Sequence, residues 1–188
     1  MSTKDISSLI FLALLPPESL GEEIKELKQE FSDKYNSKRA LRLPAHITLV
    51  PPFRLTENRS DELFMILEDF CGRFSEMEVS LKDFGAFPPR VIFIEVGNPE
   101  VLRPFRDQLF TSLENFLPVE QLKTGRSFRP HITLATRDLS RRDFYLAWEE
   151  FKDRSFDALF SVEGLTLFKH NGKIWDNITE FKFQNRER

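Results

Sequence analysis

The tetrapeptide His-Ile-Thr-Leu occurs twice in the chain, at residues 46–49 and at residues 131–134. The segments around the two copies also correspond, because residues 9–31 match residues 91–116 in their strand-then-helix pattern. Such a repeat indicates two copies of one structural unit, neither of which can bury its apolar face alone. We therefore expect an α+β chain with two similar lobes, related by a pseudo-two-fold axis, each with a sheet and outer helices.

Hydrophobic periodicity and turn residues divide the chain into strands and helices. Strands are expected at residues 6–14, 46–50, 77–87, 91–96, 131–135, 156–168 and 174–183, and helices at residues 18–31, 63–70, 99–116 and 144–151. Pro51-Pro52 ends the second strand in this interpretation, and Asn171-Gly172 turns a closing hairpin. Because no linker is visible, we expect one bilobal domain over residues 1–188, with repeats at about 5–88 and 89–185 whose terminal strands can pair across.

Composition restricts the environment and the partners. The chain has 20 Phe against 2 Trp and 2 Tyr, which predicts a Phe-rich core. Cys71 is the sole cysteine, so no internal disulfide can form, and a cytoplasmic location is expected. The net charge of -3 disfavours binding of long nucleic acid, so the expected partner is a small nucleotide or an RNA end. A monomer is expected. The apolar run at residues 9–15 is too short to span a membrane.

The repeated tetrad carries the chemistry. Alternate side chains of a strand share a face, so His46 lies beside Thr48, and His131 beside Thr133, while the Ile and Leu residues point into a core. Two imidazoles in one cleft can act as the acid and the base of phosphodiester cleavage. The two hydroxyls can donate to the non-bridging phosphate oxygens. A purely structural role is the alternative, and the repeated pairing with Thr favours catalysis.

In these two motifs and their spacing the chain resembles the 2H phosphoesterases, which include the LigT-like RNA 2′,3′-cyclic phosphodiesterases, also called 2′-5′ RNA ligases. The resemblance implies a bilobal LigT-like fold with mainly antiparallel sheets around a central cleft. It also implies that His46 donates a proton to the leaving oxygen and that His131 accepts one from water, with Thr48 and Thr133 as phosphate clamps. The sequence departs from LigT at residues 50–53, Val-Pro-Pro-Phe, and at Thr136, which precedes Arg137.

Further residues near the motifs are candidates for substrate binding. Arg42, Arg126 and Arg129 precede the two motifs and can approach other phosphates of a substrate, although a solvated loop is an equal alternative. Phe53 can stack on a base, as can Phe87 or Phe128, but core packing is the more common role of any one Phe. Three other residues are expected to have no part in the chemistry: His170 as an exposed turn residue, Trp175 as core or cleft wall, and Cys71 as an inert thiol.

The function expected from these observations is a cyclic phosphodiesterase that acts on 2′,3′-cyclic phosphate ends of RNA or nucleotides without a metal or another cofactor. The sparse His and Cys content offers no cluster of metal ligands. Two alternatives stay open, namely 2′-5′ RNA ligation at the same site and a module that binds a nucleotide or phosphate without turnover.

Overall fold

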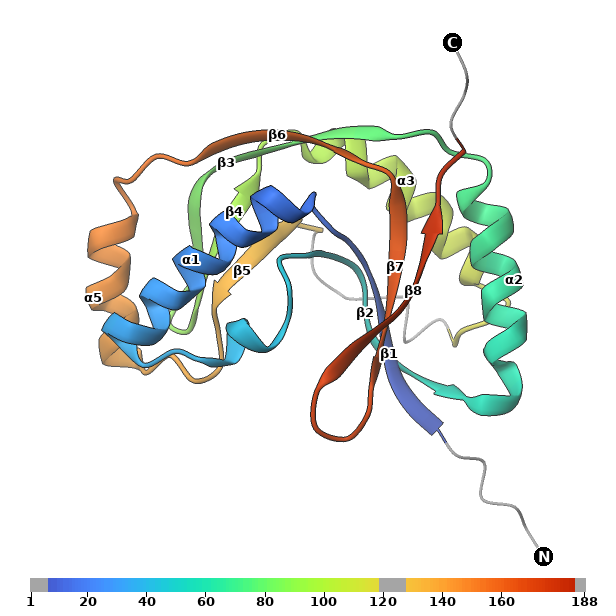
Figure 1. The fold of residues 1–188 in the computed structure, drawn as a ribbon, viewed down its shortest axis with the longest axis horizontal. Coiled ribbons are helices and arrows are strands. Elements are labelled where there is room, and N and C mark those ends of the chain that lie inside the picture. Colours follow the sequence, from blue (N-terminus) through green and yellow to red (C-terminus); the bar gives the residue numbers. More distant parts are fainter. Residues whose placement is uncertain (1–6, 119–127, 185–188) are drawn as a thin grey trace, which may run out of the picture.

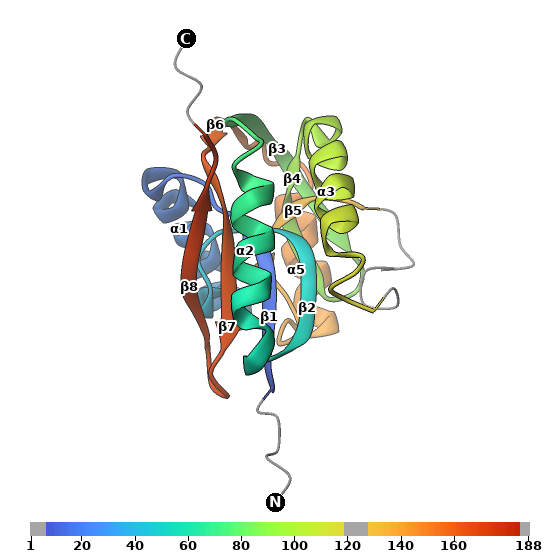
Figure 2. The ribbon, with the colours of Figure 1, turned by 90° about the vertical axis from the view of Figure 1, so that its right-hand side faces the viewer.

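The computed structural model describes residues 7–118 and 128–184, in which eight strands form one antiparallel sheet. The strands are β1 (Ser7–Leu14), β2 (Ile47–Thr56), β3 (Met77–Phe87), β4 (Val91–Val96), β5 (His131–Ala135), β6 (Asp157–Val162), β7 (Gly164–His170) and β8 (Trp175–Lys182). The helices are α1 (Glu18–Tyr35), α2 (Ser60–Cys71), α3 (Pro99–Leu113) and α5 (Arg141–Phe151), with 3₁₀ turns η1 (Arg39–Arg42) and η2 (Glu57–Arg59). The sheet curls strongly, with α1 and α5 covering one half and α2 and α3 beside the other (Figures 1 and 2).

The strand order, β6-β3-β4-β5-β2-β1-β7-β8, has a two-fold pattern. Strands β5 and β2 lie at the centre, where Ile47 pairs with Ile132. In the half that contains β5, Phe93 lies opposite Thr133, and in the half that contains β2, Ala13 lies opposite Thr48. The expected α+β fold with two related halves is thus confirmed, and the two expected sheets are continuous through their central strands.

The two halves exchange elements. Strand β3 follows α2 in sequence but pairs with β4 and β6 in the other half of the sheet. Helix α1 leaves β1 and packs on β5 and α5. From α3, which follows β4, Arg106 reaches β2 and donates from Nε to the Leu49 carbonyl at 3.0 Å. The half that contains β2 therefore holds strands from both ends of the chain, whereas the half that contains β5 is built from the strands between them, β3 to β6.

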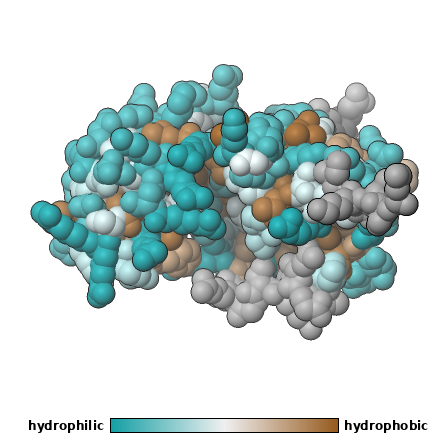
Figure 3. Space-filling model, turned by 90° about the horizontal axis from the view of Figure 1, so that it is seen from below, coloured by the Kyte–Doolittle hydropathy of each residue, from teal (hydrophilic) through white to brown (hydrophobic). Residues whose placement is uncertain are grey.

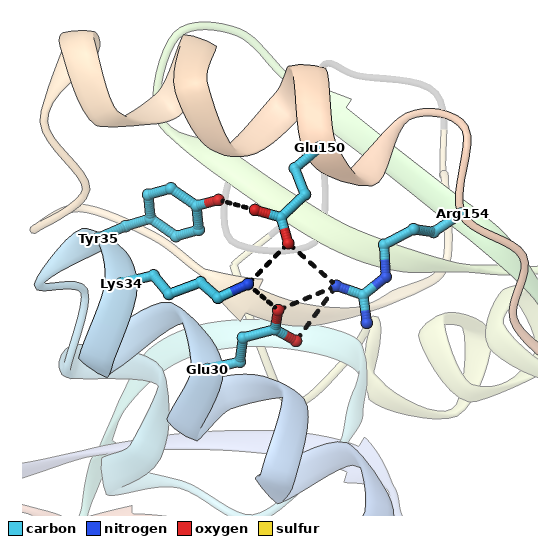
Figure 4. Close-up of polar contacts among 5 residues, drawn as sticks. All are labelled: Glu30, Lys34, Tyr35, Glu150 and Arg154. Carbon is cyan, nitrogen blue, oxygen red and sulfur yellow. Dashed lines mark hydrogen bonds and ion pairs between the residues drawn. The ribbon is translucent and has the colours of Figure 1, made fainter.

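Figure 4 shows a charged network where α1 meets α5. Lys34 Nζ lies 2.8 Å from a carboxylate oxygen of Glu30 and 2.8 Å from one of Glu150, and Arg154 also pairs with Glu30. Tyr35 donates its hydroxyl to Glu150 at 2.6 Å, and burial together with this carboxylate raises the pKa of Tyr35 to about 12. Pairs as exposed as these stabilise a fold only modestly, so the network mainly fixes how the two helices meet.

The expectation that Pro51-Pro52 ends a strand is wrong. Strand β2 continues to Thr56, and its partner strand β1 carries a register shift at this point. Because Ile10 pairs with Phe53 and Leu12 pairs with Val50, both prolines face the single residue between Ile10 and Leu12. At such a bulge the missing proline N–H groups cost no ladder hydrogen bond.

The single strand expected at residues 156–168 is also wrong, because this segment forms both β6 and β7. Strand β6 pairs with β3 in one half of the sheet, and β7 pairs with β1 and β8 in the other. The chain crosses between the halves at Gly164, where a Cβ atom would lie 2.8 Å from the Phe181 carbonyl oxygen. The apolar pattern runs on through the crossing, since β7 is buried along most of its length.

The core is rich in Phe, as the composition predicts. Among its largest fully buried side chains are seven Phe: Phe31, Phe70, Phe93, Phe105, Phe144, Phe151 and Phe168. On the opposite face of β1, Phe11 and Ala13 form a smaller apolar cluster with Phe168, against which Trp175 packs. Cys71 is buried, and burial raises the pKa of its thiol to about 12. No helix in the described ranges is long and apolar enough to cross a membrane.

The central strand pair gives a test of the fold. Ile132→Ala should lower the free energy of unfolding by about 2–5 kcal/mol, because Ile132 is fully buried and its truncation leaves a cavity at the joint between the halves. Urea unfolding followed by circular dichroism measures this loss. Ile178→Ala, at a 44% exposed position of β8, is the matched control and should change stability by less than about 0.5 kcal/mol. Equal losses would contradict the central role of the Ile47–Ile132 pair.

Candidate active site

The two histidines lie at the start of the two central strands. His46 directly precedes β2, and His131 is the first residue of β5. Ile47 and Ile132 are fully buried, whereas Thr48 and Thr133 are half-buried on the opposite face. The strands thus alternate as the sequence predicts, and each imidazole shares a face with its threonine hydroxyl.

The same type of local contact orients each of the two imidazoles. His46 Nδ1 lies 2.9 Å from the Pro44 carbonyl oxygen, and His131 Nδ1 lies 2.8 Å from the Arg129 carbonyl oxygen. A carbonyl can only accept, so Nδ1 carries the proton and donates it in each case. The second ring nitrogen, Nε2, is left to act as a base when the ring is neutral and as an acid when it is protonated.

Aromatic rings surround both imidazoles. The ring centroid of His46 lies 5.4 Å from that of Phe11 and 6.1 Å from that of Phe168. The His131 centroid lies 4.6 Å from that of Phe93 and 5.3 Å from that of Phe87. The imidazoles therefore sit in similar apolar settings, which disfavour the charged form.

The pKa values of both histidines are lowered. Burial lowers the pKa of His46 to about 4, and the positive charges of Lys28 and His131 act in the same direction. Burial also lowers the pKa of His131, as does Arg129, while Glu95 opposes the shift.

A pocket of about 260 Å³ opens beside His46, and it also includes Thr133 from the second motif. Its wall comes from α1, η1, the segment after β5 and the β7–β8 hairpin. The surface is hollowed between the two halves of the molecule in Figure 3, and many residues there are hydrophilic. Residues of both motifs therefore reach one cavity.

The structure places the other residues singled out from the sequence at different positions relative to the pocket. Arg42 lines the pocket. Arg129 lies beside His131, paired with Glu95, with its guanidinium 5.4 Å from the Phe87 ring centroid. Phe53 is only 3% exposed and belongs to the hydrophobic core, so the structure does not bring it to the pocket. Arg126 falls outside the described residues.

Four cationic residues of the pocket were not among the expected site residues: Lys28, Arg39, Arg137 and Lys173. His170, expected to be an exposed turn residue, is half-buried in the pocket wall next to Trp175, with ring centroids 4.9 Å apart. Only Lys28 left a signal in the sequence, because it occupies the apolar face of α1 at helical spacing from Ile24 and Phe31. Arg39 lies in η1, and Arg137 and Lys173 come from two separate loops.

A family model described as the 2′-5′ RNA ligase superfamily matches residues 16–174. The chain belongs to this family. The RNA 2′,3′-cyclic phosphodiesterase of Methanocaldococcus jannaschii is 25% identical over 182 residues, which cover 92% of this chain and 99% of that protein. A candidate phosphoesterase of Bacillus pumilus is 25% identical over 119 residues, which cover 62% of this chain and 66% of the relative.

Solved structures show that this member of the 2′-5′ RNA ligase superfamily has a LigT-like fold. The protein TT0787 of Thermus thermophilus superposes with a TM-score of 0.66 at 22% identity, over 95% of this chain and 100% of that one. Apo LigT of E. coli gives a TM-score of 0.65 at 18% identity, over 96% of this chain and 99% of that one. At these identities the likeness shows the fold of the chain, and the family membership comes from the match of the family model.

The lowered pKa of His46 predicts a pH effect on stability. In the unfolded chain its pKa returns to about 6.5, so unfolding takes up a proton between pH 4 and pH 6.5. His46 should thus lower the free energy of unfolding as pH falls through this window and have no further effect above or below it. Denaturant titrations at a series of pH values should show a smaller decline for His46→Asn than for the parent chain. The same decline in both proteins would show that burial does not depress the pKa of His46.

Proposed function

We propose that this member of the superfamily hydrolyses cyclic phosphodiesters, with 2′,3′-cyclic phosphate ends of RNA or nucleotides as substrates. One observation carries the proposal: two imidazoles on adjacent strands each have Nδ1 held by a backbone carbonyl, with Nε2 left for substrate. The M. jannaschii relative bears the name of this activity. E. coli LigT has been crystallised with 3′-AMP and with ATP, which supports a substrate of nucleotide size.

The reaction needs one base and one acid. In the roles that the family resemblance implies, His131 Nε2 takes a proton from water as the water oxygen bonds to phosphorus. The bond from phosphorus to one ribose oxygen breaks, and His46 Nε2 protonates that oxygen, which leaves a phosphomonoester. Hydroxyls of Thr48 and Thr133 donate to the non-bridging oxygens, where negative charge is concentrated.

The electrostatics of the free site place a condition on this mechanism. His46 must be protonated to act as the acid, yet burial and nearby cations favour its neutral form. A bound phosphodiester anion raises the pKa of an imidazole beside it, because it stabilises the positive charge. Substrate binding therefore favours the protonated form of His46 that the mechanism requires. In the free protein, by contrast, the neutral form of His46 is favoured.

In ligation to a 2′-5′ bond a 5′-hydroxyl replaces water as the group that bonds to phosphorus while the 3′ oxygen leaves, so ligation uses the same residues and stays the alternative activity. A pure binding module has no need of two imidazoles with matching orientation. Turnover of 2′,3′-cyclic mononucleotides separates these functions, since a binding module gives none. Ligation would appear as joined products when a 2′,3′-cyclic end is mixed with a free 5′-hydroxyl end.

Substitution of each motif residue tests the assignment. His46→Ala and His131→Ala should each lower turnover by about 100-fold or more, because each removes one proton-transfer group. Thr48→Val and Thr133→Val should also lower it, whereas Thr48→Ser and Thr133→Ser keep the hydroxyl and are the matched controls. Unchanged thermal midpoints would show that the variants fold. A histidine variant with near-parental turnover would remove that residue from the mechanism.

Activity should survive excess EDTA, because the proposed steps use only imidazole and hydroxyl groups. Across the described parts of the chain, no three His, Cys, Asp or Glu side chains gather closely enough to hold a metal ion. Initial rates with and without the chelator, after dialysis, measure the effect. A loss that added zinc or manganese restores would contradict the proposal.

A further inference from the structure

The pocket beside His46 concentrates positive charge. Five cationic side chains line it: Lys28, Arg39, Arg42, Arg137 and Lys173. No Asp or Glu is among its described lining residues, although the chain as a whole carries a net charge of -3. Elsewhere in the described chain Lys and Arg residues pair with carboxylates, as Lys34 and Arg154 do, but none of these five enters such a pair. The pocket is therefore complementary to an anion with several oxygen atoms.

Lys28 is the buried member of this group. It is 2% exposed, and its Nζ donates to the Leu43 carbonyl at 3.0 Å. An ammonium group has three N–H donors, and Lys28 has no other hydrogen-bond acceptor within the described residues. Burial lowers the pKa of Lys28 to about 8, so the group is still mostly charged at neutral pH. A buried charge without a counter-ion is costly, and an anionic ligand would offset that cost.

The nearby carboxylate of Asp138 serves the backbone rather than the pocket cations. It accepts from the Ser37 hydroxyl at 3.0 Å and from the backbone N–H groups of Lys38 and Arg39 at 2.8 Å each. These bonds tie the start of η1 to the segment after β5. The wall is thereby held in place, while the guanidinium groups of Arg39 and Arg137 stay available.

The two sides of the cleft differ in whether their cationic side chains are paired with carboxylates. Beside His131, the guanidinium of Arg129 is already paired with Glu95, which lies opposite His131 in the strand register. The cluster of five cations lies on the side of His46, the group proposed to protonate the leaving ribose oxygen. The ribose must therefore lie on this side during the reaction, and groups attached to it extend towards the cationic pocket.

We propose that this pocket binds a second phosphate of the substrate, on the 5′ side of the nucleotide that carries the cyclic phosphodiester. The inference rests on the proposed function for its orientation. A substrate with a 5′-phosphate, or an RNA end whose terminal nucleotide is joined through its 5′ oxygen, supplies this group. A nucleoside 2′,3′-cyclic phosphate without it leaves Lys28 uncompensated. The specificity is thus for a nucleotide with two separate phosphates, one of which reacts.

Binding of two stable nucleotides tests the inference without turnover. Isothermal titration calorimetry at fixed salt compares 3′-AMP with adenosine 3′,5′-bisphosphate on the full chain. The bisphosphate should bind at least about 10-fold more tightly, since a buried phosphate gains charge-assisted hydrogen bonds. Lys28→Met keeps the length of the side chain and should remove most of this preference. Lys152→Met, at a lysine on the surface after α5 that pairs with Glu149, is the matched control and should keep it.

Each outcome of these titrations supports or contradicts the second-phosphate site. Equal affinity for the two nucleotides in the parent chain, or no binding of either, overturns the second-phosphate site. An equal loss of affinity for both in Lys28→Met also overturns it, because Lys28 would then hold the shared 3′-phosphate. If Lys28→Met does not fold, Arg42→Gln and Arg137→Gln at exposed positions give the same readout. Preference for the bisphosphate without hydrolysis of 2′,3′-cyclic AMP or its 5′-phosphate keeps the site and refutes the proposed reaction.

Discussion

The pairing of β2 with β5 at the centre of the sheet sets the geometry on which the site depends. Ile47 faces Ile132 across this pair, and both are fully buried together with Leu49 and Leu134. Because a strand alternates its side chains, burying these residues forces the histidines and threonines of both motifs onto the other face. The requirement to fill the core and the requirement to orient two imidazoles are therefore met by the same residues.

Sequence reasoning worked where the information is local. The alternation in the motifs, the bounds of β3 and β4 and the hairpin at Asn171-Gly172 all follow from residues close together in the chain, although the hairpin loop has four residues, 171–174, in place of the expected two. It failed at Pro51-Pro52, where a bulge that depends on β1 lets the strand continue, and at Gly164, where an unbroken apolar run hides a change of partner strand. The cationic pocket was also missed, because its residues come from four separate segments and meet only through the fold.

The few carboxylates near the cleft explain its asymmetry. Glu95 neutralises Arg129 beside His131, and Asp138 is engaged with the backbone of η1. Nothing comparable neutralises the described cations beside His46, so two imidazoles with the same backbone contact and similar aromatic neighbours experience different fields. A repeated motif has in this way acquired two distinct halves, through differences in the surrounding charges and not in the motif itself.

The exchange of elements between the halves has a mechanical consequence. The central strands join through the pairing of Ile47 with Ile132, which alone would make a pliable hinge. Helix α1 spans that hinge from β1 to β5, the chain crosses it again between α2 and β3, and the Glu163–Gly164 crossing spans it a third time. These three connections resist rotation of one half against the other. The span between the two imidazoles is consequently a property of the backbone, and accommodation of different ligands falls to the long Arg and Lys side chains at the rim.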